Sequence, residues 1–135
     1  MNLKKLLLVS FLQSGIILFP SISSAQDGIV DYPAYTDGTA QVFEYNPYRQ
    51  YEIYTRVGYV TDIQLRPGEE VQKIATGNSS QWAVDTDFVA GIEHVYLKAL
   101  APELRTNIII NTSQRSYRLI ANSTNDYIGY IVIWS

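Results

Sequence analysis

At 135 residues the chain has room for one domain, and it is acidic, with 13 Asp and Glu residues against 10 Lys and Arg residues. An acidic chain lacks the basic footprint of nucleic-acid-binding proteins, so we expect no direct contact with DNA or RNA. The absence of cysteine excludes disulfides, thiolate metal sites and cysteine nucleophiles, so a hydrophobic core or a partner must hold the domain together.

Residues 1–25 have the pattern of a secretory signal peptide. Two lysines precede an apolar stretch at residues 6–20, and Ser23 and Ala25 then provide the small-residue spacing that a signal peptidase recognises. A membrane anchor is the alternative, but the stretch is interrupted by polar residues and is shorter than the roughly 18 apolar residues of a spanning helix. We therefore expect cleavage between Ala25 and Gln26, export, and no transmembrane segment in the mature chain.

Residues 26–39 are predicted to form a flexible lead, because glycine, proline and aspartate recur there without periodicity. Beyond them, apolar and polar residues alternate with period two, as in β-strands. After a weak run at 41–46, clear runs occupy residues 51–57 and 59–66. Gly58 between these two predicts either a tight turn or a bulge in one long bent strand.

Residues 66–69, with the sequence Arg-Pro-Gly-Glu, predict a type II turn. Proline presets φ at the second position, and glycine accepts the positive φ of the third. Short strands are then predicted at 71–76 and 81–85, and Trp82 in the second is expected to lie in the core. A turn is predicted at Asp85–Asp87.

Three further strands are predicted at 92–100, 106–112 and 116–121, because these runs are rich in β-branched and aromatic residues or alternate with period two. The core face of the first is expected to consist of Val95, Leu97 and Ala99.

The last predicted strand, residues 127–134, is apolar on both faces, with isoleucines on one and Tyr130, Val132 and Trp134 on the other. An edge strand that faces water normally alternates with polar residues. This strand is therefore either central and covered on both faces, or one face meets another chain. We expect the face formed by Tyr130, Val132 and Trp134 to be at least partly open and to serve as a protein interface.

The spacing of the strands indicates the fold class. Strands that recur at roughly 8 to 12 residues with turn signals between them predict an all-β fold, an antiparallel β-sandwich or a partly open barrel of about 8 to 9 short strands. No window has a sustained helical period. The domain is expected to span residues 40–135.

Catalysis is poorly supported by the residues present. His94, the single histidine, falls within a predicted strand, and no G-x-S-x-G nucleophile elbow occurs. The adjacent carboxylates Glu69 and Glu70, and the pair Asp85 and Asp87, are expected to be solvated residues of turns and not the paired acids of a glycosidase. We predict no enzyme activity, no metal and no cofactor.

Tyrosine is abundant, with 11 residues in two main clusters. Tyr45, Tyr48, Tyr51 and Tyr54 lie early, and Tyr127 and Tyr130 lie late with a tryptophan nearby. Tyrosine is a favoured strand residue, so packing is one interpretation. The other is a surface that stacks on a glycan or a peptide, which would make the chain a stand-alone periplasmic binding module.

From Tyr45 to the end, the sequence resembles the N-terminal domain of the TrbG/CagX family, the periplasmic core-complex proteins of type IV secretion and conjugal transfer systems. Four pieces in the same order carry the resemblance. They are Gly58-Tyr59-Val60-Thr61-Asp62-Ile63-Gln64-Leu65-Arg66-Pro67-Gly68-Glu69, Gly77 followed by Trp82, Leu97-Lys98-Ala99 before Thr106-Asn107-Ile108-Ile109-Ile110-Asn111-Thr112, and Arg115-Ser116-Tyr117. One departure is Asn78, where the family often has aspartate.

The resemblance implies a structural component of a secretion core complex in the periplasm, on the outer-membrane side. Its partners would be other core proteins, including copies of itself, bound through β-surfaces. The family's C-terminal domain, associated with a small lipoprotein and the ring facing the outer membrane, has no counterpart in this sequence. Those roles are therefore not carried over.

Overall fold

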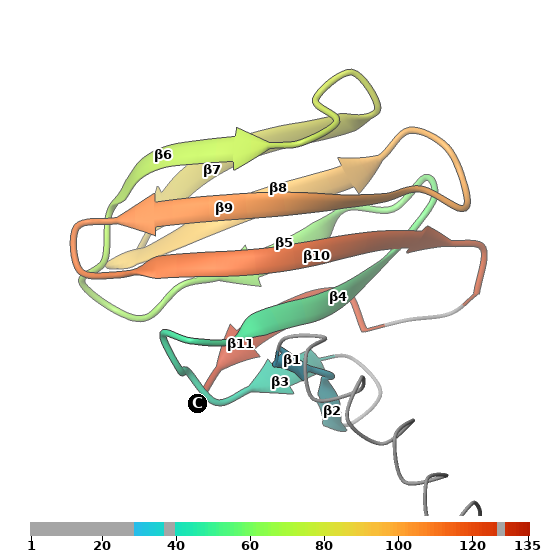
Figure 1. The fold of residues 1–135 in the computed structure, drawn as a ribbon. Helices are drawn as coiled ribbons and strands as arrows, with labels where there is room; N and C mark the ends of the chain where they lie inside the picture. The colour runs from blue at the N-terminus through green and yellow to red at the C-terminus, as the bar shows by residue number, and fades with distance from the viewer. Residues whose placement is uncertain (1–28, 37–39, 127–128) are drawn as a thin grey trace, which may run out of the picture.

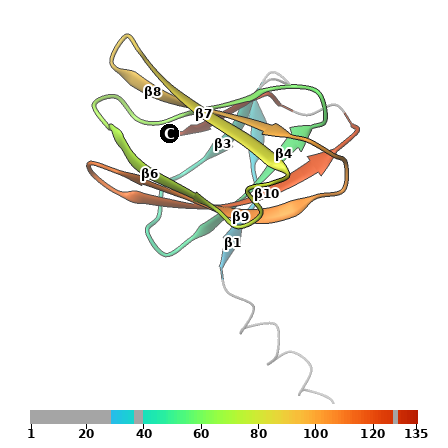
Figure 2. The same ribbon diagram turned by 90° about the horizontal axis from the view of Figure 1, so that it is seen from above.

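The computed structural model describes residues 29–36, 40–126 and 129–135, and within these ranges the chain forms strands and no helix. The strands form two stacked sheets (Figures 1 and 2). Their bounds are β1 (Val30–Asp31), β2 (Ala34–Thr36), β3 (Ala40–Phe43), β4 (Gln50–Arg56), β5 (Thr61–Gln64), β6 (Val71–Thr76), β7 (Trp82–Val89), β8 (Ile92–Ala99), β9 (Arg105–Thr112), β10 (Ser116–Thr124) and β11 (Ile131–Trp134).

The two sheets confirm the predicted all-β sandwich. One sheet has the order β1-β4-β10-β9-β6 and the other the order β2-β3-β11-β5-β8-β7. The pairing is mixed and not wholly antiparallel as predicted, because β4 runs parallel to β10, and β11 runs parallel to both β3 and β5. These parallel pairs arise because consecutive strands of the chain lie in different sheets. Each strand therefore pairs with a strand that is far away in the sequence.

Gly58 ends β4 and lets the chain change sheets. Its φ is +83°, and the amide of Tyr59 donates to the carbonyl of Arg56 at 3.1 Å. β4 lies in the five-stranded sheet, whereas β5 lies in the six-stranded one. Of the two predictions for this glycine, the tight turn is therefore confirmed. A positive φ costs glycine little, because it has no Cβ to clash with the backbone.

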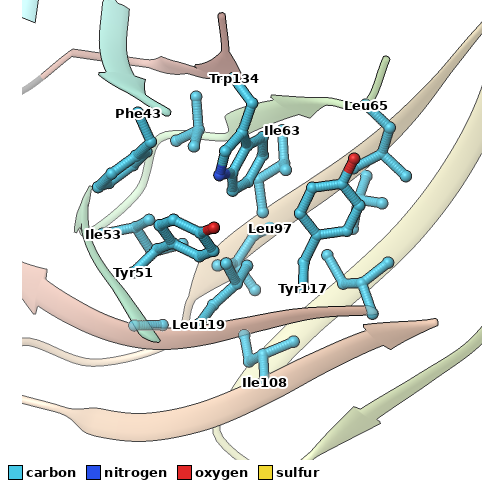
Figure 3. Close-up of a cluster of buried hydrophobic side chains, with 14 of the residues drawn as sticks. Phe43, Tyr51, Ile53, Ile63, Leu65, Leu97, Ile108, Tyr117, Leu119 and Trp134 are labelled. Carbon is cyan, nitrogen blue, oxygen red and sulfur yellow. The ribbon is translucent and has the colours of Figure 1, made fainter. Parts of the chain in front are cut away.

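The core lies between the sheets and is centred on aromatic side chains (Figure 3). The Trp134 ring lies 4.6 Å from the Tyr117 ring and 5.4 Å from the Tyr51 ring, centroid to centroid, and both tyrosines are fully buried. Trp82 is buried, as predicted. The predicted core face of β8 is also confirmed, by the burial of Val95, Leu97 and Ala99.

The described part of the expected flexible lead contains two short strands, because β1 pairs with β4 and β2 pairs with β3. Another prediction about local structure is wrong. The turn expected at Asp85–Asp87 does not exist, because β7 continues through it to Val89. The chain reverses instead at Ala90 and Gly91, both with positive φ, which is the backbone conformation of a type I′ hairpin turn.

The sandwich has two open sides. β6 and β7 end their sheets on one side, at the top of Figure 1, and β1 and β2 end them on the other. Because β6 and β7 are consecutive in the chain, one short connection joins the two edge strands. The unpaired edges of this side lie beside the domain's grooves, which are described next.

Candidate functional site

His94 is the first residue to consider as a catalytic group. It lies half-buried in β8, as expected of a strand histidine, and its Nδ1 is 2.8 Å from Oδ1 of Asp62 on β5. Across the described residues, no three His, Asp or Glu side chains come together in a way that could hold a metal ion. The contact of His94 with Asp62 is therefore a hydrogen bond between two strands and not a recognisable reaction centre.

Glu69 is not the solvated turn residue that the sequence predicted. Its side chain is fully buried, and its carboxylate accepts hydrogen bonds from the hydroxyls of Thr112 at 2.7 Å and Tyr117 at 2.5 Å. Arg115 contributes positive charge, with Nε 3.3 Å from the carboxylate. The predicted turn itself is confirmed, with φ of +84° at Gly68.

This buried carboxylate has a structural explanation. Glu69 ends the turn after β5, whereas Thr112, Arg115 and Tyr117 belong to the hairpin that joins β9 to β10. A buried charge is costly unless it is paired and hydrogen-bonded, and here both conditions are met. The hydrogen bonds thus fix the turn against the hairpin. Glu70, next in sequence, is exposed as predicted.

The face of β11 that was expected to be open is closed. Val132 is fully buried and Trp134 is 6% exposed, because β11 lies between β3 and β5 and these two side chains point into the core. Tyr130 is half-buried, and its ring stacks on Tyr59 at 5.3 Å. The prediction of an open interface is therefore wrong for Val132 and Trp134 within this chain.

The tyrosines do not form one binding face. Tyr51 is fully buried, Tyr45 packs against the core, and Tyr54 is half-buried. Tyr48, by contrast, is 85% exposed in the turn before β4. Most of the early cluster thus serves packing, and Tyr127 lies outside the described residues.

β7 is a long strand that is largely exposed to solvent. From Asp85 to Val89 every residue is exposed, including Phe88 at 52% and Val89 at 46%. β7 ends its sheet and pairs only with β8, in continuous register from Trp82 to Val89. Two large apolar side chains thus stand in water on a strand whose outer edge has no partner strand.

A groove lies on each side of β7. The first, about 450 Å³, is mainly apolar and is lined by Val60, Ala83, Val84, Asp85, Tyr96 and Lys98. The second, also about 450 Å³, is mainly polar and lies between the edge strands of the two sheets, where it is lined by Val71, Gln72, Lys73, Ile74 and Thr76 of β6 and by Val84, Asp85 and Thr86 of β7. The sandwich is therefore incompletely closed along this side.

Negative charge gathers around the same strand. Asp85 and Asp87 are the cross-strand neighbours of Tyr96 and His94, and Asp62 is opposite Tyr96 on the other side. Burial first, and then Asp87, Asp62 and Asp85, raise the pKa of the Tyr96 hydroxyl.

This exposed edge was not predicted from the sequence, because both β7 aspartates were assigned to a turn. The alternation of Ala83, Asp85, Asp87 and Val89 with Trp82 and Val84 was the signal for a longer strand.

The comparisons with known proteins agree with this architecture. The model of the CagX family, described as conjugal transfer protein, matches residues 38–135, which include every strand from β3 to β11. No curated protein matches the chain. In the part of the chain that the structure describes, no helix is long and apolar enough to cross a membrane. The chain therefore belongs to the CagX family of conjugal transfer proteins.

Proposed function

We propose that this chain is a structural component of a type IV secretion core complex, the envelope machine of conjugal transfer, and that it acts by binding neighbouring proteins. The observation that carries the proposal is the family match, which extends over nearly the whole sandwich. The exposed edge strand and the mainly apolar groove beside it support it, since sheet edges and apolar grooves are common sites of protein recognition. Its partners would be other core proteins, including copies of itself.

The proposed location is the periplasm, on the outer-membrane side of the complex. The support is the N-terminal pattern of residues 1–25, which predicts export and cleavage between Ala25 and Gln26. These residues lie outside those that the structure describes. Intact-mass measurement of protein from the periplasmic fraction tests the prediction, and a chain that still begins at Met1 would contradict it.

Gene deletion tests the role in transfer. In the host bacterium, an in-frame deletion is expected to abolish conjugal transfer, counted as transconjugants per donor cell, and a plasmid-borne copy is expected to restore it. Purification of the tagged protein under mild solubilisation should recover other envelope proteins of the same transfer system. Unchanged transfer in the deletion strain would refute the proposal.

A further inference from the structure

The outer edge of β7 is suited to accept another strand. Its eight residues keep register with β8 without a bulge, and the strand contains no proline and no lysine, so its two aspartates are the one feature of those that commonly protect sheet edges. β6, the other edge strand on this side, has a register shift between Val71 and Lys73. β7 is therefore the longer and more regular of the two edges.

The backbone pattern identifies which groups of β7 are available. Leu100 donates its amide to the carbonyl of Gln81 at 3.0 Å, so the polar groups of this pair face each other across the hairpin. In antiparallel pairing the direction of the polar groups alternates, which turns those of Val84, Thr86 and Phe88 away from β8. The Thr86 amide accordingly has no partner on β8 and donates instead to Oδ1 of its neighbour Asp85, at 2.8 Å, a local bond that an added strand would have to replace.

The two faces of β7 define what an added strand would need. On the outer face, Asp85 and Asp87 take part in none of the ion pairs found among the described residues. Opposite charges stabilise cross-strand neighbours, so lysine or arginine is favoured beside them. On the other face, Phe88 is exposed and Val84 and Ile74 are only partly buried, so apolar side chains would remove more apolar surface from water there.

We propose that β7 binds, by strand addition, an extended segment of a partner protein in which basic and apolar residues alternate. This inference rests on the proposed function and names the chemistry of one partner. The apolar side chains of the segment pack on Ile74, Val84 and Phe88, along the apolar part of the groove between β6 and β7, and its basic side chains lie beside Asp85 and Asp87. The segment thereby closes the open side of the sandwich.

A second copy of the chain fits this edge poorly. Antiparallel pairing of β7 with itself about Thr86, the register that pairs the outward-facing groups of Val84 and Phe88, places Asp85 and Asp87 of one copy beside those of the other, and like charges in cross-strand positions are destabilising. The other edge strands offer little positive charge, since β1 and β2 contain no lysine or arginine and β6 contains only Lys73. Charge complementarity therefore favours a different, basic partner.

Peptide binding tests the proposal directly. The probe is a short fluorescein-labelled peptide of alternating lysine and valine, and the matched control peptide has glutamate in place of lysine. Fluorescence anisotropy with the purified chain is expected to show binding of the lysine peptide, weakened by salt, and much weaker binding of the glutamate peptide. Equal binding of both peptides, or of neither, would overturn the proposal.

Variants distinguish peptide binding at the β7 edge from a general effect of the negative charge of the protein. The double variant Asp85→Asn/Asp87→Asn is expected to weaken binding about three- to tenfold, the effect of losing two exposed charge pairs. Glu44→Gln/Asp126→Asn removes the same charge from exposed sites outside β7 and should bind like the wild type. Thr86→Pro deletes one outward-facing amide and should reduce binding while circular dichroism remains native, because proline is tolerated at edge positions. Wild-type binding by Thr86→Pro would contradict strand addition.

Cross-linking and transfer assays distinguish this inference from the proposed function. A photo-reactive residue at position 86 should cross-link to an extended basic segment of another envelope protein, identified by mass spectrometry. Cross-links to the chain itself, with dimers in sedimentation, would overturn the proposal in favour of a second copy. Strains that carry Asp85→Asn/Asp87→Asn or Thr86→Pro are then compared with the deletion strain. If both variant strains give the wild-type number of transconjugants while the deletion strain does not, the β7 site is refuted and the structural role stands.

Discussion

The hydroxyl of Tyr117 donates to Oε2 of Glu69 at 2.5 Å, in a region where both side chains are fully buried. The contact joins residues 48 positions apart in sequence. Together with the 2.7 Å bond from Thr112, it attaches the turn after β5 to the β9–β10 hairpin. A buried acceptor of this kind stabilises the fold only while its donors are present.

Glu69→Gln is therefore expected to destabilise the domain by about 1–3 kcal/mol, since an amide nitrogen replaces one oxygen and cannot accept from Thr112 or Tyr117. Urea denaturation followed by tryptophan fluorescence measures the change. Glu70→Gln is the matched control, because Glu70 is exposed and should change stability by less than about 0.5 kcal/mol. Similar midpoints for the two variants would contradict the structural role of Glu69.

The stability of the domain should fall at alkaline pH because of Tyr117. Burial, followed by the hydrogen bond to Glu69, raises the pKa of Tyr117 above its ordinary value of 10.0. The unfolded chain then loses this proton at a lower pH than the folded chain. The contribution is complete below pH 10 and is lost above it, at up to about 1.4 kcal/mol per pH unit.

Urea denaturation at a series of pH values from 8.5 to 11 measures this slope, with the values chosen to lie on either side of the ordinary tyrosine pKa of about 10. Tyr117→Phe should be less stable at pH 8.5 but should lose less further stability above pH 10. Burial also raises the pKa of Tyr51, so part of the slope is expected to remain in this variant. The same slope in both proteins would show that Tyr117 does not carry the effect.

Trp82 and Phe88 lie on the same strand and provide a test of where the core ends. Trp82 is 4% exposed, so Trp82→Ala is expected to cost about 3–5 kcal/mol of unfolding free energy. Phe88 is 52% exposed, and Phe88→Ala should change stability by less than about 0.5 kcal/mol. Equal costs measured by urea denaturation would mean that β7 is buried along its whole length.

Val132 tests the closure of the face around β11. A lysine at this fully buried position would place an unpaired charge in the core, at a cost of several kcal/mol that consumes much of a typical domain's stability of about 5–15 kcal/mol. Val132→Lys, and the double variant Val132→Lys/Trp134→Lys, are therefore expected to lose the native circular dichroism spectrum. Val89→Lys, at an exposed position, should retain it, and a folded Val132→Lys would reopen the idea of an interface on this face.

The sequence was informative wherever the relevant signal is local. Alternation with period two identified the strands and correctly predicted the core face of β8, because a sheet with one buried face imposes that period directly. The turn at residues 66–69 was predictable for the same reason, since proline and glycine specify its backbone angles.

The features that the sequence did not reveal depend on distant residues. The parallel pairing of β4 with β10 joins Tyr51 to Leu119, and neither strand carries a local mark of its partner. Glu69 lies in a segment whose composition is typical of a solvated turn. Its burial is possible because hydroxyls from the β9–β10 region donate hydrogen bonds to its carboxylate. The apolar character of β11 permitted a central strand or an interface, and the choice depended on the neighbouring strands β3 and β5.

The hairpin between β7 and β8 was misplaced because its turn has an unusual sequence. Type I′ turns require positive φ at both central positions and favour Asn-Gly, whereas this chain has Ala90 with φ of +51° followed by Gly91. An L-residue other than glycine or asparagine in this conformation costs about 1–2 kcal/mol. Asp85 and Asp87, five and three residues before Ala90, therefore gave the stronger turn signal.

Ala90→Asn should consequently stabilise the domain. Asparagine tolerates the left-handed conformation better than alanine, so part of that strain is relieved, and we expect a gain of about 0.5–1 kcal/mol. The expected readout is a higher urea midpoint with an unchanged slope, which indicates a stability change without altered compactness. Gly91→Ala is the opposing control, because its φ of +83° disfavours any Cβ, and it should lower the midpoint although the space around it is open. A lower midpoint for Ala90→Asn would mean that the β7–β8 turn does not have the type I′ conformation.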